Sequence, residues 1–214
     1  MNKGQKNKNY PWVGHFYEPL VGFKWRPSEF SRNAAEIVVW NDVFLHDDSD
    51  NSYAILLMDT QGVYNSGLSI TSVANILALN ALFSTFFIYN VEFPMSTDNF
   101  ESLRLSLEHG KNLLDAKVNH EGEDFAAQPF HSFAFLFHDV NRKVDTRWGF
   151  NGGSEIVRKY FAADDYQGFN VNAAFENIFG FSMPPAGNAM LQKTYDGRFA
   201  HLDPEFQVHL QTFI

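Results

Sequence analysis

The sequence predicts an α/β domain built on a mostly parallel sheet. Apolar runs with strand character alternate along the chain with amphipathic helical segments, and no internal repeat or interdomain linker separates them. The 214 residues are 45% hydrophobic and include 23 Phe, which is enough apolar material for a large core without disulfides or metal. The length favours one domain, so we expect a polar tail over residues 1–9 and a single domain over 10–214.

The first half of the chain predicts a hairpin, a helix and a strand. Ala34–Leu45 alternates and then becomes apolar, Tyr53–Met58 is a second apolar run, and the polar cluster Asp47–Ser52 lies between them. These features predict two strands joined by a turn longer than two residues. A helix over Ser69–Ala81 and a buried strand over Phe83–Tyr89 follow.

The second half predicts further helices and strands. Asp98 and Glu101 have capping-box spacing, and the apolar residues that follow continue a helical stripe to Leu114. The later predicted elements are a buried strand over Phe133–Phe137, a helix over Glu155–Phe161, a short helix over Ala173–Phe179, a loop over Ser182–Gly187 and a helix over Pro204–Phe213.

Composition excludes several classes of function. Lys and Arg number 16 against 25 Asp and Glu, a formal charge of −9, and no basic stripe is present, so we expect no nucleic-acid partner. Without cysteine there is neither a disulfide framework nor thiol catalysis. The polar start lacks the apolar region of a signal peptide. Thr60–Val91 is free of charge, but Asn75, Asn80 and Asn90 favour a buried helix and strand over a membrane span.

One motif with chemical meaning ends the second predicted strand. Asp59 follows an apolar run, and Gly62 follows it after two residues. This is the pattern of the second nucleotide motif of P-loop NTPases, where the carboxylate holds Mg²⁺ through water and the glycine N–H approaches a γ-phosphate. The alternative is a turn that ends a strand, and the motif alone favours that alternative.

His138 and Asp139 end the Phe133–Phe137 strand. A carboxylate at this sheet edge can accept two hydrogen bonds from the N1–H and 2-amino group of guanine and thus distinguish guanine from adenine. An ordinary Asp at a strand-to-loop junction is the alternative. The phosphate-binding pattern G-x-x-x-x-G-K-[ST] is absent from the 214 residues, and with it the amide cradle and lysine that hold phosphates.

Several stretches resemble the atlastins, GTPases of the dynamin superfamily that dimerise through their G domains and fuse endoplasmic-reticulum membranes. The stretches include Trp12–Gly14, Glu18–Arg26, Leu56–Gly62, Pro129–Asp139 and Gly149–Gly153, followed by Tyr195–Gly197 and Asp203–Phe206. The resemblance implies a three-layer G domain of the P-loop NTPase type that lacks its first strand, phosphate loop and first helix. It is closer to atlastins than to the related guanylate-binding proteins.

The resemblance also implies roles for single residues. Asp59 would be the Mg²⁺-water carboxylate, Gly62 the γ-phosphate amide, and His138 with Asp139 the guanine-reading pair. The loop Ser182–Asp196 would lie near the base, where partner G domains meet. GTP and Mg²⁺ would be ligand and cofactor, and a second atlastin-type G domain the partner, in a homodimer or heterodimer. The implied location is the cytosolic face of the endoplasmic reticulum.

Three departures from the family pattern bear on activity. The phosphate loop, which carries the family's catalytic arginine, is missing from the sequence, so no catalytic residue is assigned. The switch I Thr pair is Ala34-Ala35, and the Arg of the family's Arg-Asp motif is His138. We therefore expect an atlastin-like G domain with impaired GTP hydrolysis. The alternatives are a non-catalytic dimerisation module and an incomplete gene product.

Overall fold

The computed structural model describes residues 16–19, 22, 37–47, 52–60, 69–121, 130–141, 147–161 and 174–214, with side chains excepted at 70 and 113–121. Its elements are β1 (Ile37–Val39), β2 (Phe44–Asp47), β3 (Ser52–Ile55), β4 (Met58–Thr60), α1 (Ile70–Phe83), β5 (Phe86–Glu92), α2 (Thr97–Glu121), β6 (Phe130–His138), α3 (Gly149–Phe161), β7 (Phe175–Ser182) and α4 (Pro204–Phe213). Two short 3₁₀ helices, η2 (Asn188–Leu191) and η3 (Phe199–His201), precede α4.

The first four strands form the predicted hairpin in two sections. β2 pairs antiparallel with β3, from Phe44 opposite Ile55 to Asp47 opposite Ser52. The Ser52 hydroxyl donates to Asp47 Oδ1 at 2.6 Å beside the turn. β1 pairs antiparallel with β4, so that Asp59 lies opposite Val38.

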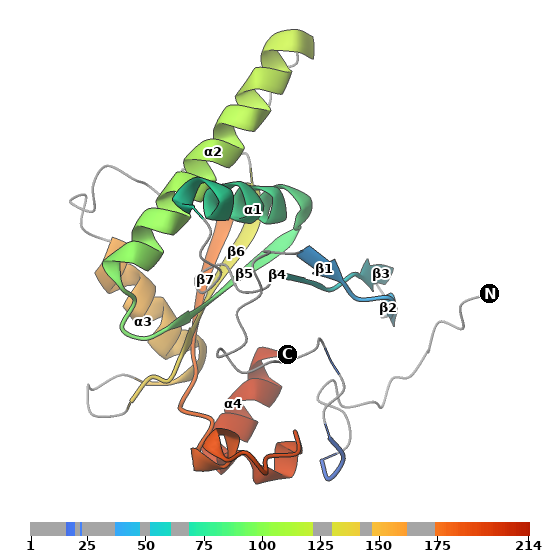
Figure 1. Ribbon diagram of the computed structural model, residues 1–214, viewed down its shortest axis with the longest axis vertical. Coiled ribbons are helices and arrows are strands. Elements are labelled where there is room, and N and C mark those ends of the chain that lie inside the picture. Colours follow the sequence, from blue (N-terminus) through green and yellow to red (C-terminus); the bar gives the residue numbers. More distant parts are fainter. Residues whose placement is uncertain are drawn as a thin grey trace.

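The main sheet contains β5, β6 and β7 in that order, and all three strands are parallel (Figure 1). α1 leads into β5, α2 connects β5 to β6, and α3 connects β6 to β7, as parallel pairing requires. Among the described strands, β5 pairs only with β6, and β4 pairs only with β1. Among these strands, the hairpin and the three-stranded sheet therefore do not pair with each other.

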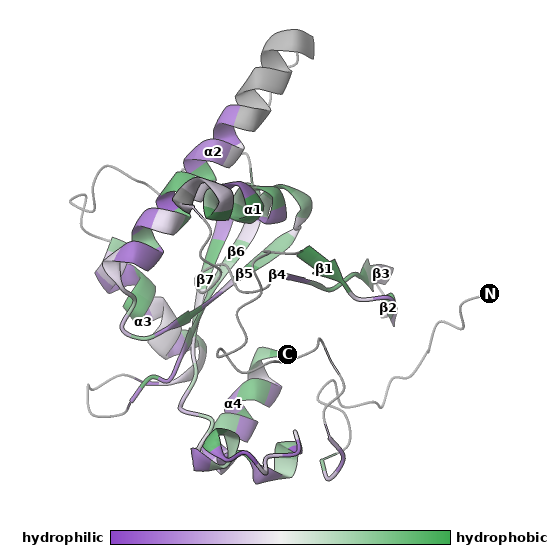
Figure 2. Cartoon of the chain, viewed as in Figure 1, coloured by the Kyte–Doolittle hydropathy of each residue, from purple (hydrophilic) through white to green (hydrophobic). Residues whose placement is uncertain are grey.

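The core lies on one face of the main sheet. Phe87, Tyr89 and Val91 of β5 stand beside Phe133, Phe135 and Phe137 of β6 on that face. They pack against Leu77 of α1, Leu103 and Leu107 of α2, and Ile156 of α3. The three strands are largely hydrophobic, whereas α2 carries bands of hydrophilic residues (Figure 2). Stacking of aromatic rings across neighbouring strands accounts for the high Phe content.

The second face of the sheet is covered only in part by described residues. Phe181 is buried there by Phe213 of α4 and by Phe150 in the first turn of α3, with ring centroids 4.9 Å and 4.8 Å away. Phe86, Ile88 and Phe179 lie on the same face and remain 49%, 44% and 41% exposed. We expected helices on both faces; the described residues place α1, α2 and α3 on one face and only α4, with Phe150 of α3, on the other.

Most predicted elements are present, and two predictions were wrong. The short helix expected over Ala173–Phe179 is a strand, β7, because pairing of Phe175 with Phe130 and of the following residues along β6 outweighs a helical spacing of apolar residues. The expected capping box of Asp98 and Glu101 does not form. Ser96 caps α2 by accepting the Asn99 N–H at 3.2 Å.

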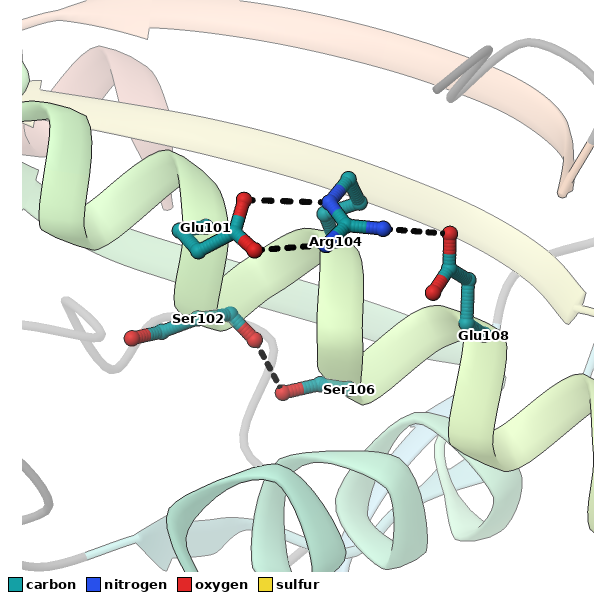
Figure 3. A network of polar contacts seen from close by, with 5 residues as sticks. All are labelled: Glu101, Ser102, Arg104, Ser106 and Glu108. Carbon is teal, nitrogen blue, oxygen red and sulfur yellow. Dashed lines mark hydrogen bonds and ion pairs between the residues drawn. The ribbon is translucent and has the colours of Figure 1, made fainter. Parts of the chain in front are cut away.

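Glu101 instead contributes to an ion-pair row along α2. Arg104 donates to both carboxylate oxygens of Glu101 and to Glu108 at 2.7 Å (Figure 3). Spacings of three and four residues bring these side chains together on one side of the helix. Glu101 therefore forms an ion pair with Arg104 within the helix and does not cap its start.

α3 begins six residues earlier than predicted. Gly152 and Gly153 lie inside it, and a Cβ at Gly153 would overlap the backbone of Gly180 in β7. Gly153 thus lets the helix backbone contact the strand directly, and Gly152 leaves room for the Arg147 carbonyl, although glycine weakens a helix. Within the described residues, no helix is long and apolar enough to cross a membrane.

Candidate functional site

Asp59 lies in the middle of β4, in the short two-stranded section of the hairpin. Its side chain is half-buried. Burial raises the pKa of the Asp59 carboxyl, and a hydrogen bond from the backbone of Thr60 partly opposes that rise. This position provides a carboxylate but little stabilisation of its charge.

Gly62 and the Ala34-Ala35 pair lie outside the described residues. No group of three or more His, Cys, Asp or Glu side chains that could hold a metal ion occurs in the part of the chain that the structure describes. Mg²⁺ generally needs near-octahedral oxygen ligands, including substrate phosphates. Asp59 would supply one carboxylate, and the other oxygen ligands would come from substrate phosphates and water, so we assign no step to a metal.

Asp139 lies immediately after the carboxyl end of β6. Its backbone adopts a left-handed conformation, with φ of 59°, which Asp tolerates better than most residues. His138 Nδ1 lies 2.7 Å from Asp139 Oδ2, and the two side chains are 36% and 48% exposed. The turn thus presents a carboxylate to solvent with one oxygen in contact with the preceding imidazole.

The backbone that follows Asp139 is fixed on both sides. The Val140 N–H donates to the Met183 carbonyl at 3.0 Å, next to the end of β7. Trp148 Nε1 donates to the Val140 carbonyl at 2.8 Å. Sequence reasoning missed this role of Trp148, although an isolated Trp immediately before the Gly149 stretch was a usable signal.

The loop expected near the base begins beside this turn. Met183, the second residue of Ser182–Asp196, contacts both Phe137 and Val140 through its backbone. At the other end of the segment, Asp196 lies 3.2 Å from Arg198 Nε and 3.4 Å from His201 Nδ1. Burial and the nearby Asp196 charge raise the pKa of Tyr195. The start of the loop therefore lies next to Asp139.

The structure does not bring Asp59 and Asp139 together. Asn80, in the last turn of α1, donates to the hydroxyl of Thr60 at 2.5 Å, and α1 ends at Phe83, shortly before β5 begins at Phe86. Asp139 follows the opposite end of the parallel pair, where His138 lies beside Glu92. Six residue steps at ~3.3 Å place these ends about 20 Å apart. The sequence predicted that both carboxylates lie at one sheet edge, and that arrangement is not seen.

Comparisons with known proteins place the chain in a family. The model of the guanylate-binding protein N-terminal domain matches residues 5–214. Atlastin of Drosophila melanogaster is 29% identical over 212 residues, which are 95% of this chain and 38% of that protein. Atlastin-2 of Xenopus laevis and atlastin-1 of Macaca fascicularis are also 29% identical, over 95% of this chain and 36% of each relative. The chain spans less than two fifths of these relatives. It belongs to the guanylate-binding protein N-terminal domain family and is similar to the atlastins over 95% of its own length.

Proposed function

We propose that this chain binds guanine nucleotides and that Asp139 recognises the base. The observation that carries the proposal is the Asp139 turn, in which a half-exposed carboxylate stands at the carboxyl end of a parallel strand. The next residue, Val140, is held through its backbone by Met183 and Trp148. Ligands of open parallel sheets bind at this edge. An ionised carboxylate has two acceptor oxygens and suits the two adjacent donors of guanine.

Asp139→Asn provides the test. The amide replaces one acceptor with a donor, so the affinity of the variant for GDP should fall roughly 10- to 100-fold. Xanthine carries an oxygen where guanine has its 2-amino group, so the variant should bind xanthosine diphosphate better than the unmutated chain does. Asp42→Asn, at an exposed position on the hairpin, is the matched control. Equal affinity of the unmutated chain for GTP and ATP would contradict the proposal.

GTP hydrolysis by these 214 residues is expected to be absent or very slow. The G-x-x-x-x-G-K-[ST] motif is missing, and Ala34-Ala35 replaces the hydroxyl residues of switch I. Phosphate release from GTP that depends on Mg²⁺ and disappears in Asp59→Ala would contradict it.

A non-catalytic pairing module is the second candidate function. The departures remove residues for hydrolysis but retain the strands that build the core, and Ser182–Asp196 begins beside the base-reading turn. By similarity to atlastins, we propose that this chain pairs with an atlastin-type G domain at the cytosolic face of the endoplasmic reticulum. Light scattering of the chain mixed with an intact atlastin-type G domain tests the pairing. An unchanged mass in the presence of GTP would exclude it.

A further inference from the structure

We propose that His138 is a positioning residue that orients the Asp139 carboxylate and thereby sets the preference for guanine. This inference rests on the proposed function of Asp139 and adds a second residue to it. The observation is the 2.7 Å contact between His138 Nδ1 and Asp139 Oδ2 at the end of β6.

The contact fixes the position of a proton on the imidazole. An ionised carboxylate only accepts hydrogen bonds, so His138 must donate, and the proton must be on Nδ1. The length is typical of a hydrogen bond to a charged group. The neutral His138 ring therefore carries its proton on Nδ1 and leaves Nε2 without one.

The same contact leaves the base-reading capacity of Asp139 intact. Each carboxylate oxygen has two acceptor sites, so Oδ2 can accept from His138 and from a nucleobase together, while Oδ1 stays available. Without the imidazole, a carboxylate that is 48% exposed would rotate and would lose entropy when it binds. His138 reduces that loss by holding the carboxylate in one orientation.

Backbone contacts ensure that His138 itself is well placed. It is the last residue of β6, opposite Glu92 of β5, and its carbonyl accepts the Phe93 N–H at 3.0 Å. Because both side chains of the pair are partly exposed, their contact contributes little to folding stability. Removing the imidazole should therefore change base selection while leaving the fold intact.

Two substitutions separate positioning from structure. His138→Ala removes the donor, whereas His138→Asn places an amide N–H close to where Nδ1 stood. We expect His138→Ala to reduce the ratio of GDP to ADP affinity roughly fivefold, as the loss of one hydrogen bond would. His138→Asn should retain most of the ratio. His131→Ala, an exposed histidine at the other end of β6, is the control and should leave it unchanged.

The tautomer of His138 gives a measurement that does not depend on nucleotide. Nitrogen NMR of the neutral ring at pH 9 should find the proton on Nδ1, and Asp139→Gly, which removes the acceptor without strain at a positive φ, should shift it to Nε2. A proton on Nε2 in the unmutated chain would overturn the inference. An unchanged ratio of GDP to ADP affinity in His138→Ala would also overturn the inference, but it would not contradict guanine recognition by Asp139.

A third outcome separates the two proposals. If the unmutated chain shows no preference for GDP over ADP, the proposed function fails and His138 sets no selectivity. If the proton is on Nδ1 in the unmutated chain and moves to Nε2 in Asp139→Gly, the result would still support the claim that His138 orients the carboxylate.

Discussion

At the scale of single residues, environment separates the two candidate carboxylates. Asp59 lies half-buried in the hairpin, where desolvation disfavours its charge. Asp139 is on an exposed turn in contact with an imidazole. The sequence predicted that both end or follow a strand, which is a local property. It did not predict their separation, because that depends on which strands pair, and pairing is decided by contacts between distant residues.

Asp59→Asn should stabilise the protein at neutral pH. Burial raises the pKa of Asp59 in the folded state above the ordinary 3.8, so the folded state binds this proton more tightly than the unfolded chain. The free energy of unfolding therefore falls as pH rises from the ordinary pKa of 3.8 through the raised pKa of the folded state. We expect a gain of less than about 1 kcal/mol at pH 7, because the side chain is only half-buried.

Urea unfolding at pH 7 and pH 3 measures this effect. At pH 3 the carboxyl is protonated in both states, so Asp59→Asn should match the unmutated chain. Asp42→Asn, at an exposed hairpin position, serves as the comparison. An equal gain at both pH values would point to packing rather than charge.

The backbone at Asp139 yields a second prediction. Asp139→Ala and Asp139→Gly both remove the carboxylate, but only alanine retains a Cβ at φ of 59°. Alanine should lower the free energy of unfolding by about 1 kcal/mol relative to glycine. Urea unfolding of the two variants measures the difference, and equal stabilities would show that the turn is not held in this conformation.

At the scale of elements, local signals predicted the starts of α1 and α4 but the wrong capping residue for α2. Ser69 caps α1 by accepting the Ser72 N–H, and Asp203 with Pro204 begins α4, whereas α2 is capped by Ser96 rather than Asp98. Other errors arose where packing decides. Gly152 and Gly153 looked like a helix boundary but lie within α3, and the helical spacing near Phe175 belongs to a strand that pairs with β6.

The α2 cap tests this contrast directly. Ser96→Ala should lower the free energy of unfolding by about 1 kcal/mol, because the Asn99 N–H loses its acceptor. Asp98→Ala should have a smaller effect, since Asp98 contributes only its charge near the helix start. Thermal unfolding of both variants measures the two losses of stability. A larger effect of Asp98→Ala would restore the capping box predicted from sequence.

The contact between α3 and β7 gives the strongest prediction for stability. Gly153→Ala would push α3 away from β7, because the new Cβ overlaps the Gly180 backbone. We expect a loss of about 3 kcal/mol in urea unfolding. Gly22→Ala, with no atom within 4 Å of the added methyl, is the control. A tolerated Gly153→Ala would show that the two backbones are not in direct contact.

At the scale of the whole molecule, the described strands form separate sheets rather than one. β4 and β5 each pair along one edge, and α1 links them through the Asn80 to Thr60 hydrogen bond. The family resemblance predicted this opening, whereas the local pattern of strands and helices did not. The Asp139 turn is held by residues that directly follow β6 and β7 and by Trp148, just before α3, so these contacts do not involve the hairpin.

The exposed face of the main sheet predicts association at high protein concentration. Phe86, Ile88 and Phe179 form an apolar surface beside the open edge of β5, a strand whose only charged residue is Glu92. Such edges pair readily with other chains unless charge or proline blocks them.

Ile88→Lys places a charge on this face without touching the core side of β5. Light scattering of concentrated protein should therefore fall. Val208→Lys, at an exposed valine of α4, introduces the same charge elsewhere and should change scattering much less. Equal reductions would assign the association to net charge rather than to this face.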